Sequence, residues 1–178
     1  MEKYVNMADI ISAQELSDAE TVALIELLFF AYRDFVSDPD EILTEFGFGR
    51  AHHRVLHFVG RDPGMTVQQL LDILRITKQS LGRVLKELID KEFVFQKEGE
   101  TDRRQRLLFL TDKGEALRQR LMAPQMARIR GAVTVPEGEA AHLYRKVLYQ
   151  MVNPENRDSV RDWIDRASII GDPDRPRG

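Results

Sequence analysis

The chain has 178 residues, of which 43% are hydrophobic, 31% are charged and none is cysteine. This length accommodates one domain with a substantial core but not two ordinary ones, and the lack of cysteine excludes disulfides, thiolate metal sites and thiol-based redox sensing. No apolar run reaches the roughly 18 residues of a membrane span, and the acidic start Met1-Glu2-Lys3-Tyr4 does not resemble a signal peptide. We therefore expect a cytoplasmic protein without a membrane partner.

The net charge of −3 is distributed unevenly along the chain. Residues 2–40 carry nine acidic and two basic side chains, a net of −7, whereas residues 75–106 carry nine basic and six acidic ones, a net of +3. Contacts with nucleic-acid phosphates require local positive charge. The second segment is where such contacts would lie.

Residues 1–14 have a weak pattern and are expected to fray or to pack as an arm. A helix is predicted from Ser17, with Asp18 and Glu20 in the first turn, where the helix dipole favours anions. Between residues 22 and 36 its apolar side chains lie on nearly every side, so the helix must be covered all round. In so small a chain we expect a second subunit to cover one side, and we expect Asp38-Pro39-Asp40 to end the helix.

Residues 40–60 are predicted to form a helix or a broken pair of helices, interrupted near Gly47 and Gly49. His53 and His57 lie within it at a spacing of four residues, which puts both rings on one helical face and could bind a metal. No HExxH pattern and no cysteine accompany them, so we predict no metal site and favour a structural or surface role. A contact with a ligand is the alternative.

Residues 66–91 are predicted to form two helices joined by the short turn Arg75-Ile76. Thr66 and Gln69 make a capping box at the start of the first helix. Apolar residues then recur at helical spacing. They are Val67, Leu70, Leu71 and Leu74 in the first helix, and Leu81, Val84, Leu85 and Leu88 in the second, which runs from about Thr77 to Lys91.

The other side of the second helix is polar, basic and locally small. Its candidate contact residues are Thr77, Lys78, Gln79, Ser80, Gly82, Arg83 and Lys86. This arrangement fits a recognition helix that lies in a DNA major groove. Gly82 costs about 1 kcal/mol relative to alanine inside a helix, which a close backbone approach to a partner explains. A solvated polar face is the alternative for an amphipathic helix taken alone.

Two short apolar runs, residues 93–95 and 107–110, have the length of strands and flank a connection that contains Gly99. A hairpin is therefore predicted, with a tip that projects cations. Its candidate contact residues are Thr101, Asp102, Arg103, Arg104 and Arg106. Arginine on an extended arm can enter a narrow minor groove, and Asp102 is expected to hold one of these arginines in place through charge pairing.

In architecture, about residues 20–150 resemble the MarR family of bacterial transcriptional regulators, and the specific motifs lie between residues 66 and 114. The family's wing signature is matched by Asp102, Arg104, Leu110-Thr111 and Gly114, and the helix pair lies upstream at the expected distance. The resemblance implies a mainly α fold with a small β-hairpin wing, in which a winged helix-turn-helix lobe is joined to terminal helices that form a dimerisation region. It also implies that the helix carrying His53 and His57 borders a cleft where several members bind effectors.

After Gly114 a long helix is predicted to about Arg130, with a kink at Pro124. Residues 131–136 break the chain. The next helix carries a clean apolar stripe, made of Ala140, Leu143, Tyr144, Val147, Leu148 and Met151, and the first long helix of the same or the other subunit should cover it. Val160, Trp163 and Ile164 are expected to form a short helix that packs on the dimerisation region.

The expected domains are residues 1–61 for the N-terminal helices of the dimerisation region and linker, 62–114 for the DNA-binding lobe, 115–170 for the C-terminal dimerisation helices and 171–178 for a disordered tail. The function implied is a homodimeric regulator that binds a pseudo-palindromic site on double-stranded DNA, as a repressor relieved by a small molecule. We expect no cofactor and no catalytic residue, because no nucleophile elbow, phosphate-binding glycine loop or metalloprotease motif is present. A winged helix used only for protein contacts is the alternative, although such a wing has no need of three arginines together.

Overall fold

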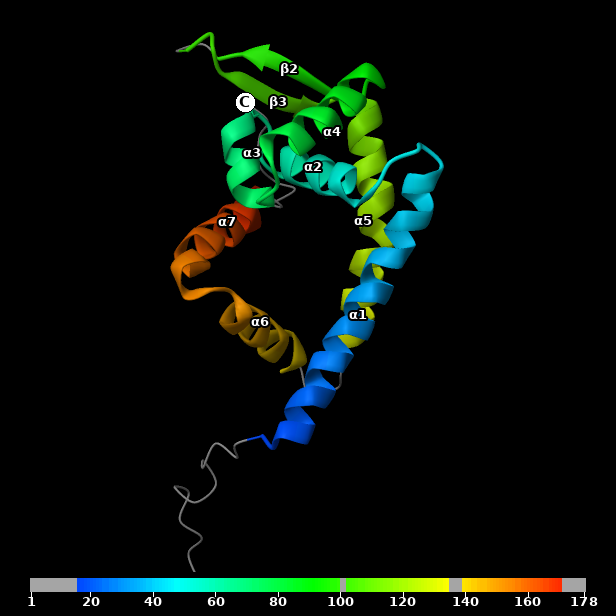
Figure 1. Ribbon diagram of the computed structural model, residues 1–178, viewed down its shortest axis with the longest axis vertical. Coiled ribbons are helices and arrows are strands. Elements are labelled where there is room, and N and C mark those ends of the chain that lie inside the picture. Colours follow the sequence, from blue (N-terminus) through cyan, green and yellow to red (C-terminus); the bar gives the residue numbers. More distant parts are fainter. Residues whose placement is uncertain (1–15, 100–101, 135–138, 171–178) are drawn as a thin grey trace, which may run out of the picture. The chain divides into compact units, whose positions relative to one another are not determined.

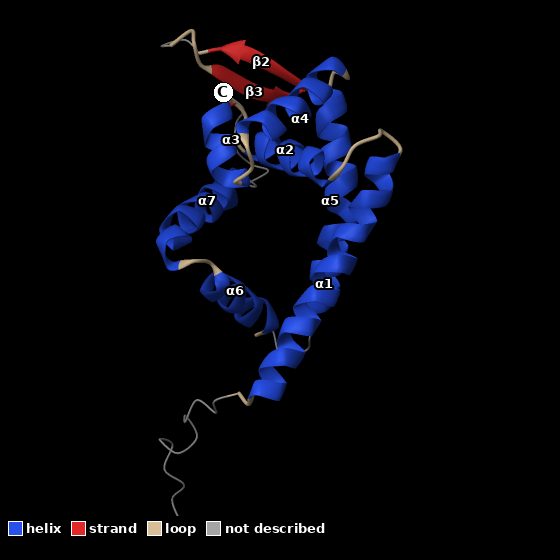
Figure 2. Cartoon of the chain, in the orientation of Figure 1, coloured by secondary structure: helices blue, strands red, loops and turns tan. Residues whose placement is uncertain are grey.

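The computed structural model describes residues 16–99, 102–134 and 139–170. Helices dominate it, and the strands are confined to one small sheet (Figure 2). The elements in chain order are α1 (Asp18–Thr44), α2 (Arg50–Arg61), β1 (Met65–Thr66), α3 (Val67–Leu74), α4 (Lys78–Asp90), β2 (Val94–Glu98), β3 (Arg106–Leu110), α5 (Asp112–Val133), α6 (Ala140–Met151), the 3-10 turn η2 (Pro154–Asn156) and α7 (Arg157–Ile170) (Figure 1). The chain divides into two compact units, residues 1–35 and 36–178. The expected N-terminal arm and C-terminal tail lie outside the described residues.

The first turn of α1 is capped by its own side chains. Ser17 donates from its backbone nitrogen and its hydroxyl to Glu20 Oε2 at 2.9 and 2.7 Å, and the Glu20 amide donates to Ser17 Oγ at 3.3 Å. These bonds hold the pKa of Glu20 below its ordinary value. The helix start predicted near Ser17 is confirmed. Beyond it, eight large apolar side chains are exposed, namely Val22, Leu24, Ile25, Leu27, Leu28, Phe29, Phe30 and Tyr32.

The prediction that Asp38-Pro39-Asp40 ends this helix is wrong, because α1 continues through Pro39 to Thr44. Proline inside a helix removes one backbone hydrogen bond and costs about 3 kcal/mol. Pro39 and Leu43 are both buried, Leu43 to 1% exposure, and that burial offsets the cost. The break comes instead at Gly47, whose φ of +68° favours glycine, and Gly49 then caps α2. The interruption predicted near these two glycines is confirmed.

The helix-turn-helix forms as its capping residues predict. The Gln69 amide donates to Thr66 Oγ1 at 3.2 Å and the Thr66 amide donates to Gln69 Oε1 at 2.7 Å, which is the reciprocal capping box. Thr77 caps α4 by accepting from the Ser80 amide at 3.1 Å. Between the helices, Arg75 turns the chain in the left-handed region with φ +50°. The buried faces of the two helices join one core, to which Leu70, Leu74, Leu81, Val84, Leu85 and Leu88 belong.

The sheet has three antiparallel strands in the order β1-β3-β2. Leu108 on β3 pairs with Met65 on one side and Gln96 on the other. The strand β1 was not predicted, because two residues carry no periodicity and Thr66 also caps α3. At the start of α5, Gly114 packs against the backbone of Phe93. A Cβ on Gly114 would overlap the Phe93 carbonyl oxygen. This contact joins the wing to the long helix.

The C-terminal helices differ in how they are covered. In α5, Leu117 and Leu121 are buried in the lobe core, whereas the apolar stripe of α6 is exposed. On α7 the Trp163 ring lies 5.4 Å from the Phe58 ring of α2, among the side chains packed against the lobe core. Phe58 lies within residues 1–61, the segment expected to hold the N-terminal dimerisation helices and the linker, so the expectation that this helix packs on the dimerisation region stays a prediction. Of the helices described, none is both long and apolar enough to cross a membrane.

Candidate DNA-binding site

The recognition face is the side of α4 that the lobe core leaves uncovered. Because the buried side chains of α4 fix the rotation of the helix, the predicted contact residues are turned outward. Lys78, Gln79, Gly82, Arg83 and Lys86 are exposed and Ser80 is half-buried, while Thr77 forms the cap. The first turn of α4 thus presents the side chains of Lys78 and Gln79 at a helix N-terminus, where the helix dipole suits an anionic partner.

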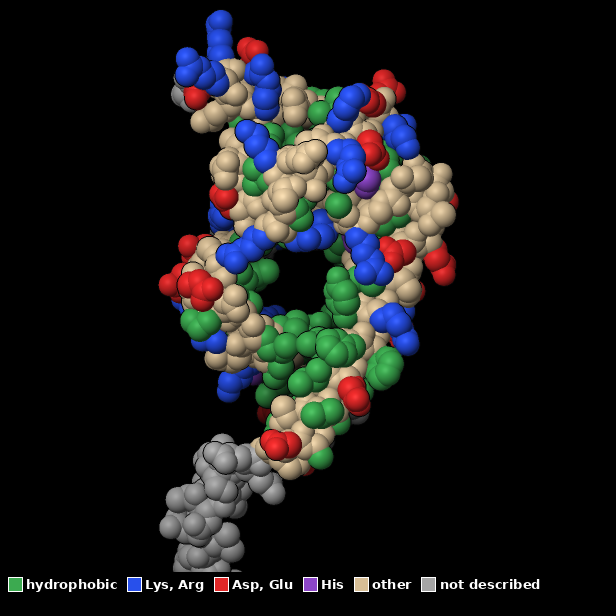
Figure 3. Space-filling view, viewed as in Figure 1, with side chains coloured by type: hydrophobic (Ala, Val, Ile, Leu, Met, Phe, Trp, Pro, Cys, Tyr) green, Lys and Arg blue, Asp and Glu red, His purple; other side chains and the backbone are tan. Residues whose placement is uncertain are grey.

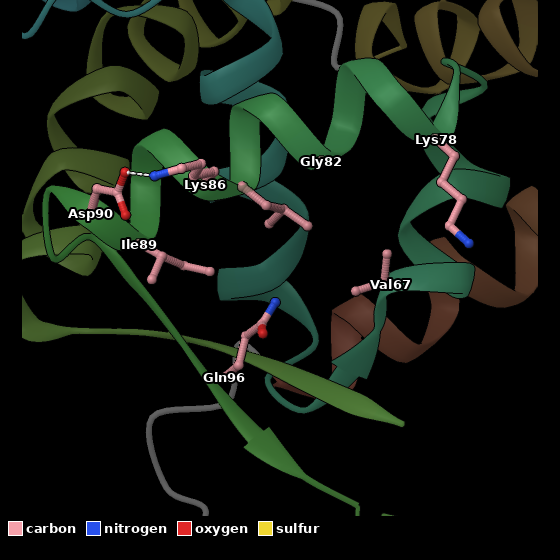
Figure 4. A pocket seen from close by; sticks show the side chains of 8 residues that line it. Val67, Lys78, Gly82, Lys86, Ile89, Asp90 and Gln96 are labelled. Carbon is pink, nitrogen blue, oxygen red and sulfur yellow. Dashed lines mark hydrogen bonds and ion pairs between the residues drawn. The ribbon is translucent and has the colours of Figure 1, made fainter. Parts of the chain in front are cut away.

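A groove of about 400 Å³ runs between α4 and the wing. Its apolar floor comes from Val67, Leu85 and Ile89, and its polar rim comes from Lys78, Lys86, Asp90 and Gln96. Figure 4 shows Lys78 and Lys86 at separate places along the rim, with Gln96 rising from β2 opposite α4. Gly82 lies between the two lysines, and a Cβ built on it would meet nothing described within 4 Å. The backbone of α4 is therefore open to close approach at this point.

Lys86, which lines this groove near the C-terminal end of α4, has a carboxylate beside it. Lys86 Nζ forms an ion pair with Asp90 one turn later, although the two side chains remain 74% and 57% exposed. Asp90 and Gln96 were not predicted as site residues. Asp90 could have been found from the four-residue spacing of opposite charges on a helix, whereas the place of Gln96 depends on the fold of the wing.

The wing tip is built by backbone hydrogen bonds around Asp102. Its Oδ1 accepts from the Arg104 amide at 2.9 Å, and its carbonyl accepts from the Gln105 amide at 3.0 Å. Among the described residues it makes no ion pair with an arginine side chain, so the expected charge pairing is wrong. The carboxylate instead fixes the backbone of Arg104, as short acidic side chains do in turns.

The wing arginines fall into two groups. Arg106 Nη1 lies 3.2 Å from Glu98 Oε1 and donates to the Arg103 carbonyl at 2.8 Å, so this side chain braces the two strands. Arg103 and Arg104 are exposed at the tip, where Figure 3 shows Lys and Arg side chains gathered over the wing. Thr101, the remaining predicted wing residue, lies outside the described residues.

A further residue that the sequence did not single out connects α2 to the recognition helix. His52 Nδ1 accepts from the Gly49 amide at 3.1 Å, so its Nε2 carries the proton that is donated to Glu87 Oε2 on α4, at 3.0 Å. The ring also stacks on Phe48 with centroids 4.5 Å apart. The placement of α4 therefore depends on a buried histidine of α2.

The two histidines of the predicted effector cleft lie in different surroundings. His57 lines a second cavity of about 400 Å³ between α2 and α5, together with Arg61, Arg118, Gln119, Met122, Met126 and Arg130. His53 is not among the lining residues. Arg118 is held there by Glu115, with Nε–Oε2 and Nη2–Oε1 distances of 2.7 and 2.6 Å. No group of residues suited to a metal ion occurs in the described parts of the chain.

His57 is kept neutral in this cavity. Its Nδ1 is buried and has no hydrogen-bond partner among the described residues. Burial, and then the charges of His53, Arg118 and Arg61, lower the pKa of His57 to about 4. Burial also lowers the pKa of His53, against the opposing charge of Asp40. The cavity therefore offers a neutral imidazole beside guanidinium groups.

These features define the class of the protein: a winged helix-turn-helix, with an exposed polar face on α4 and an arginine-tipped hairpin. Residues 46–105 match the sequence model of the MarR family. The HTH-type transcriptional regulator PetP of Rhodobacter capsulatus is 45% identical to this chain over 142 residues, which are 80% of this chain and 86% of that protein. The chain therefore belongs to the MarR family of DNA-binding transcriptional regulators, a family of regulators rather than enzymes.

Solved structures agree on the fold. A SlyA-like transcription regulator of Listeria monocytogenes superposes with a TM-score of 0.61 at 18% identity, covering 85% of this chain and 97% of that one. FabT of Streptococcus pneumoniae, solved in complex with DNA, gives 0.61 at 20% identity over 74% and 96%. A mutant MarR of E. coli, complexed with operator DNA, gives 0.58 at 21% identity over 75% and 96%. The predicted mainly helical fold with a small wing is confirmed.

Proposed function

We propose that this MarR family regulator acts as a homodimeric repressor, which binds a pseudo-palindromic operator and is released from it by a small-molecule effector. The observation that carries the proposal is the surface formed by the exposed side of α4 and the wing tip. FabT and MarR, which share the fold, were solved with DNA. Their binding of DNA supports the proposal that this chain binds DNA as well.

In the proposed complex, the N-terminal half of α4 enters the major groove. Lys78 and Gln79 lie nearest the base edges, because the first turn of a recognition helix approaches them most closely. Lys86, farther along α4, is suited to a phosphate. The wing would reach the adjacent minor groove. There Arg104, whose backbone is held by Asp102, would present a cation to the negative potential of a narrow groove.

Dimerisation is proposed from the exposed apolar side chains of α1 and α6, which are open to solvent in the space-filling view (Figure 3). Phe29 is 66% exposed on α1, and Val147 is 58% exposed on α6. A soluble monomer rarely leaves so many large apolar residues uncovered. Burial of apolar surface contributes about 25 cal/mol per Å², so the pairing of two copies is the favoured way to cover them.

Effector control is proposed at the cavity between α2 and α5. A molecule there would contact His57 and Arg61 on α2 and Arg118 on α5 at once. Because α2 also holds α4 through the His52–Glu87 contact, a change in α2 would reach the recognition helix. His53 does not line the cavity, so it would influence such a molecule only by its charge, which lowers the pKa of His57.

The experiment that tests this function is selection of bound sequences from random duplex DNA with the full chain. We expect enrichment of two inverted half-sites whose centres lie about one helical turn, roughly 34 Å, apart. Enrichment of a single half-site would contradict the dimer. A failure to enrich any sequence would contradict operator recognition and would favour a winged helix used for protein contacts.

A further inference from the structure

The segment after α6 forms an elbow that is fixed by its own side chains. Arg157, the first residue of α7, donates from Nε to the Val152 carbonyl at 3.1 Å and from Nη2 to the Gln150 carbonyl at 2.7 Å. These are carbonyls at the end of α6, which have no partner within the helix. Arg161 Nη2 also donates to the Tyr149 hydroxyl at 2.5 Å. The direction of α7 is thus set relative to α6.

One contact ties this elbow to the helix-turn-helix. Arg75 Nη2 donates to Asn156 Oδ1 at 2.5 Å, and Arg75 is the left-handed residue of the turn between α3 and α4. Left-handed backbone costs a non-glycine residue about 1 kcal/mol or more, so contacts that hold this residue matter for the turn. The cap of α4, Thr77, follows only two residues later. A restraint on Arg75 is therefore a restraint on the start of the recognition helix.

A second contact is made from α7. The Trp163 ring is half-buried against Phe58 of α2, at a centroid distance of 5.4 Å and an interplanar angle of 64°. The Arg166 guanidinium lies 5.5 Å from the centroid of the same ring. Aromatic pairs of this edge-on kind contribute about 0.5–1.5 kcal/mol beyond their burial. The elbow thus makes two separate contacts, one with the turn between α3 and α4 and one with α2.

We infer that Asn156 and Trp163 are positioning residues for DNA binding, which tie the placement of the recognition helix to α6 through this elbow. The inference rests on the proposed function, because α6 carries the apolar stripe assigned to the second copy. The contacts of the elbow fix the position of α4 relative to α6 of the same chain. The distance between the two recognition helices of a dimer is then fixed, and with it the spacing of the half-sites.

The alternative is that the elbow only covers apolar surface. The two roles differ in what the loss of the contacts changes. A cover stabilises the fold and leaves the geometry of DNA binding alone. A positioning contact sets which spacing of half-sites is bound best, whether or not the fold loses stability.

The test compares the full chain with Asn156→Ala, Trp163→Ala and the double variant. Glu155→Gln, an exposed neighbour of Asn156 in η2, is the matched control. The probes are the duplex obtained by selection and versions with one or two base pairs inserted or deleted between the half-sites. We expect the double variant to weaken the preference for the parental spacing by about threefold or more, with the half-site sequence unchanged and the control like the parent. An unchanged spacing preference, even with a lower melting temperature, would overturn the inference.

A second measurement, on the free protein, does not depend on the dimer. Hydrogen exchange at the amides of residues 75–80 should be faster in Asn156→Ala than in Glu155→Gln, while amides of the lobe core stay protected. Equal exchange in the two variants would overturn the positioning role. If the parent chain sediments as a monomer or selects a single half-site, the proposed function fails, and the exchange result still decides the role of Asn156 at the turn.

Discussion

Lys86 and Asp90 form an ion pair on the rim of the groove between α4 and the wing, so the surface proposed to bind DNA carries a carboxylate beside one of its cations. DNA phosphates and Asp90 compete for the same ammonium group. The pair is exposed, and exposed pairs contribute at most about 1 kcal/mol to folding. Its main effect is therefore expected on DNA affinity.

Asp90→Asn should strengthen binding to every duplex. The change removes a negative charge from the groove and releases Lys86 for a phosphate, so the salt slope of binding should rise by up to about one. Titrations at several salt concentrations, against the selected duplex and against scrambled DNA, measure this. Asp158→Asn removes the same charge from a carboxylate on α7 that is 92% exposed, and should change the affinity far less. Equal effects of the two variants would show that net charge alone is responsible.

Gly82 and Gly114 should respond oppositely to alanine. A methyl group at Gly82 meets nothing described within 4 Å, so Gly82→Ala should raise the free energy of unfolding by about 1 kcal/mol. It should also weaken DNA binding, if the α4 backbone approaches the duplex there. At Gly114 the methyl group meets the Phe93 backbone, and overpacking of this kind costs about 1–3 kcal/mol. Denaturant unfolding and DNA titration of both variants check this. A Gly82→Ala protein that binds as the parent does would argue against close approach.

The stability of the protein should depend on pH through His57. Because the pKa of His57 is lowered to about 4 in the folded state, against about 6.5 in an unfolded chain, the unfolded chain binds more protons between these pH values. The stabilisation is present above pH 6.5 and is lost as the pH falls toward 4, by at most about 1.4 kcal/mol per pH unit. Denaturant unfolding at pH 7 and pH 5 should show a smaller difference for His57→Gln than for the parent. His142→Gln, at an exposed histidine of α6, is the control, and identical pH dependence in all three proteins would refute the assignment.

The expectation that His53 and His57 bind no metal can be checked with a double variant. Replacement of both His53 and His57 with glutamine should cause a modest loss of stability and leave operator binding intact. If zinc is bound by the parent chain and not by this double variant, in calorimetric titration with the metal alone, the structural role expected for the two histidines is wrong.

The apolar stripe of α6 should be required for the dimer. Leu148 is 41% exposed in the isolated chain, and in the proposed dimer it is covered by the second copy. Leu148→Glu would bury an unpaired charge there, which is costly, so sedimentation should show a monomer or a much weaker dimer. Gln150→Glu places the same charge on an exposed position of the same helix and should remain dimeric. A dimeric Leu148→Glu protein would exclude α6 from the interface.

Much of the lobe could be predicted from the sequence because local chemistry and packing agree there. Two helices are specified by local signals, namely the capping box of Thr66 and Gln69 and the apolar spacing of α4. The buried stripe of each helix then determines which side chains face outward. The errors lie where tertiary contacts decide. Burial of Pro39 and Leu43 keeps α1 helical as far as Thr44, and Leu108 gives Met65 a strand partner. The place of Gln96 in the groove likewise depends on the pairing of β2 with β3, which the sequence alone does not give.

We expect the α4 face and the wing tip to bind DNA in adjacent grooves, and titration of Arg104→Ala beside Lys86→Ala distinguishes the two contacts. Arg104→Ala should lose affinity and also relax the preference for A·T pairs at the flanking positions, because minor-groove readout depends on groove width. Lys86→Ala should weaken all duplexes about equally and lower the salt slope by about one, since a phosphate contact carries no direct sequence information. Arg83 can reach either a base edge or a phosphate, and the same titration of Arg83→Ala would assign it. If Arg104→Ala binds both the selected operator and scrambled DNA as the parent does at every salt concentration, the wing does not enter the minor groove.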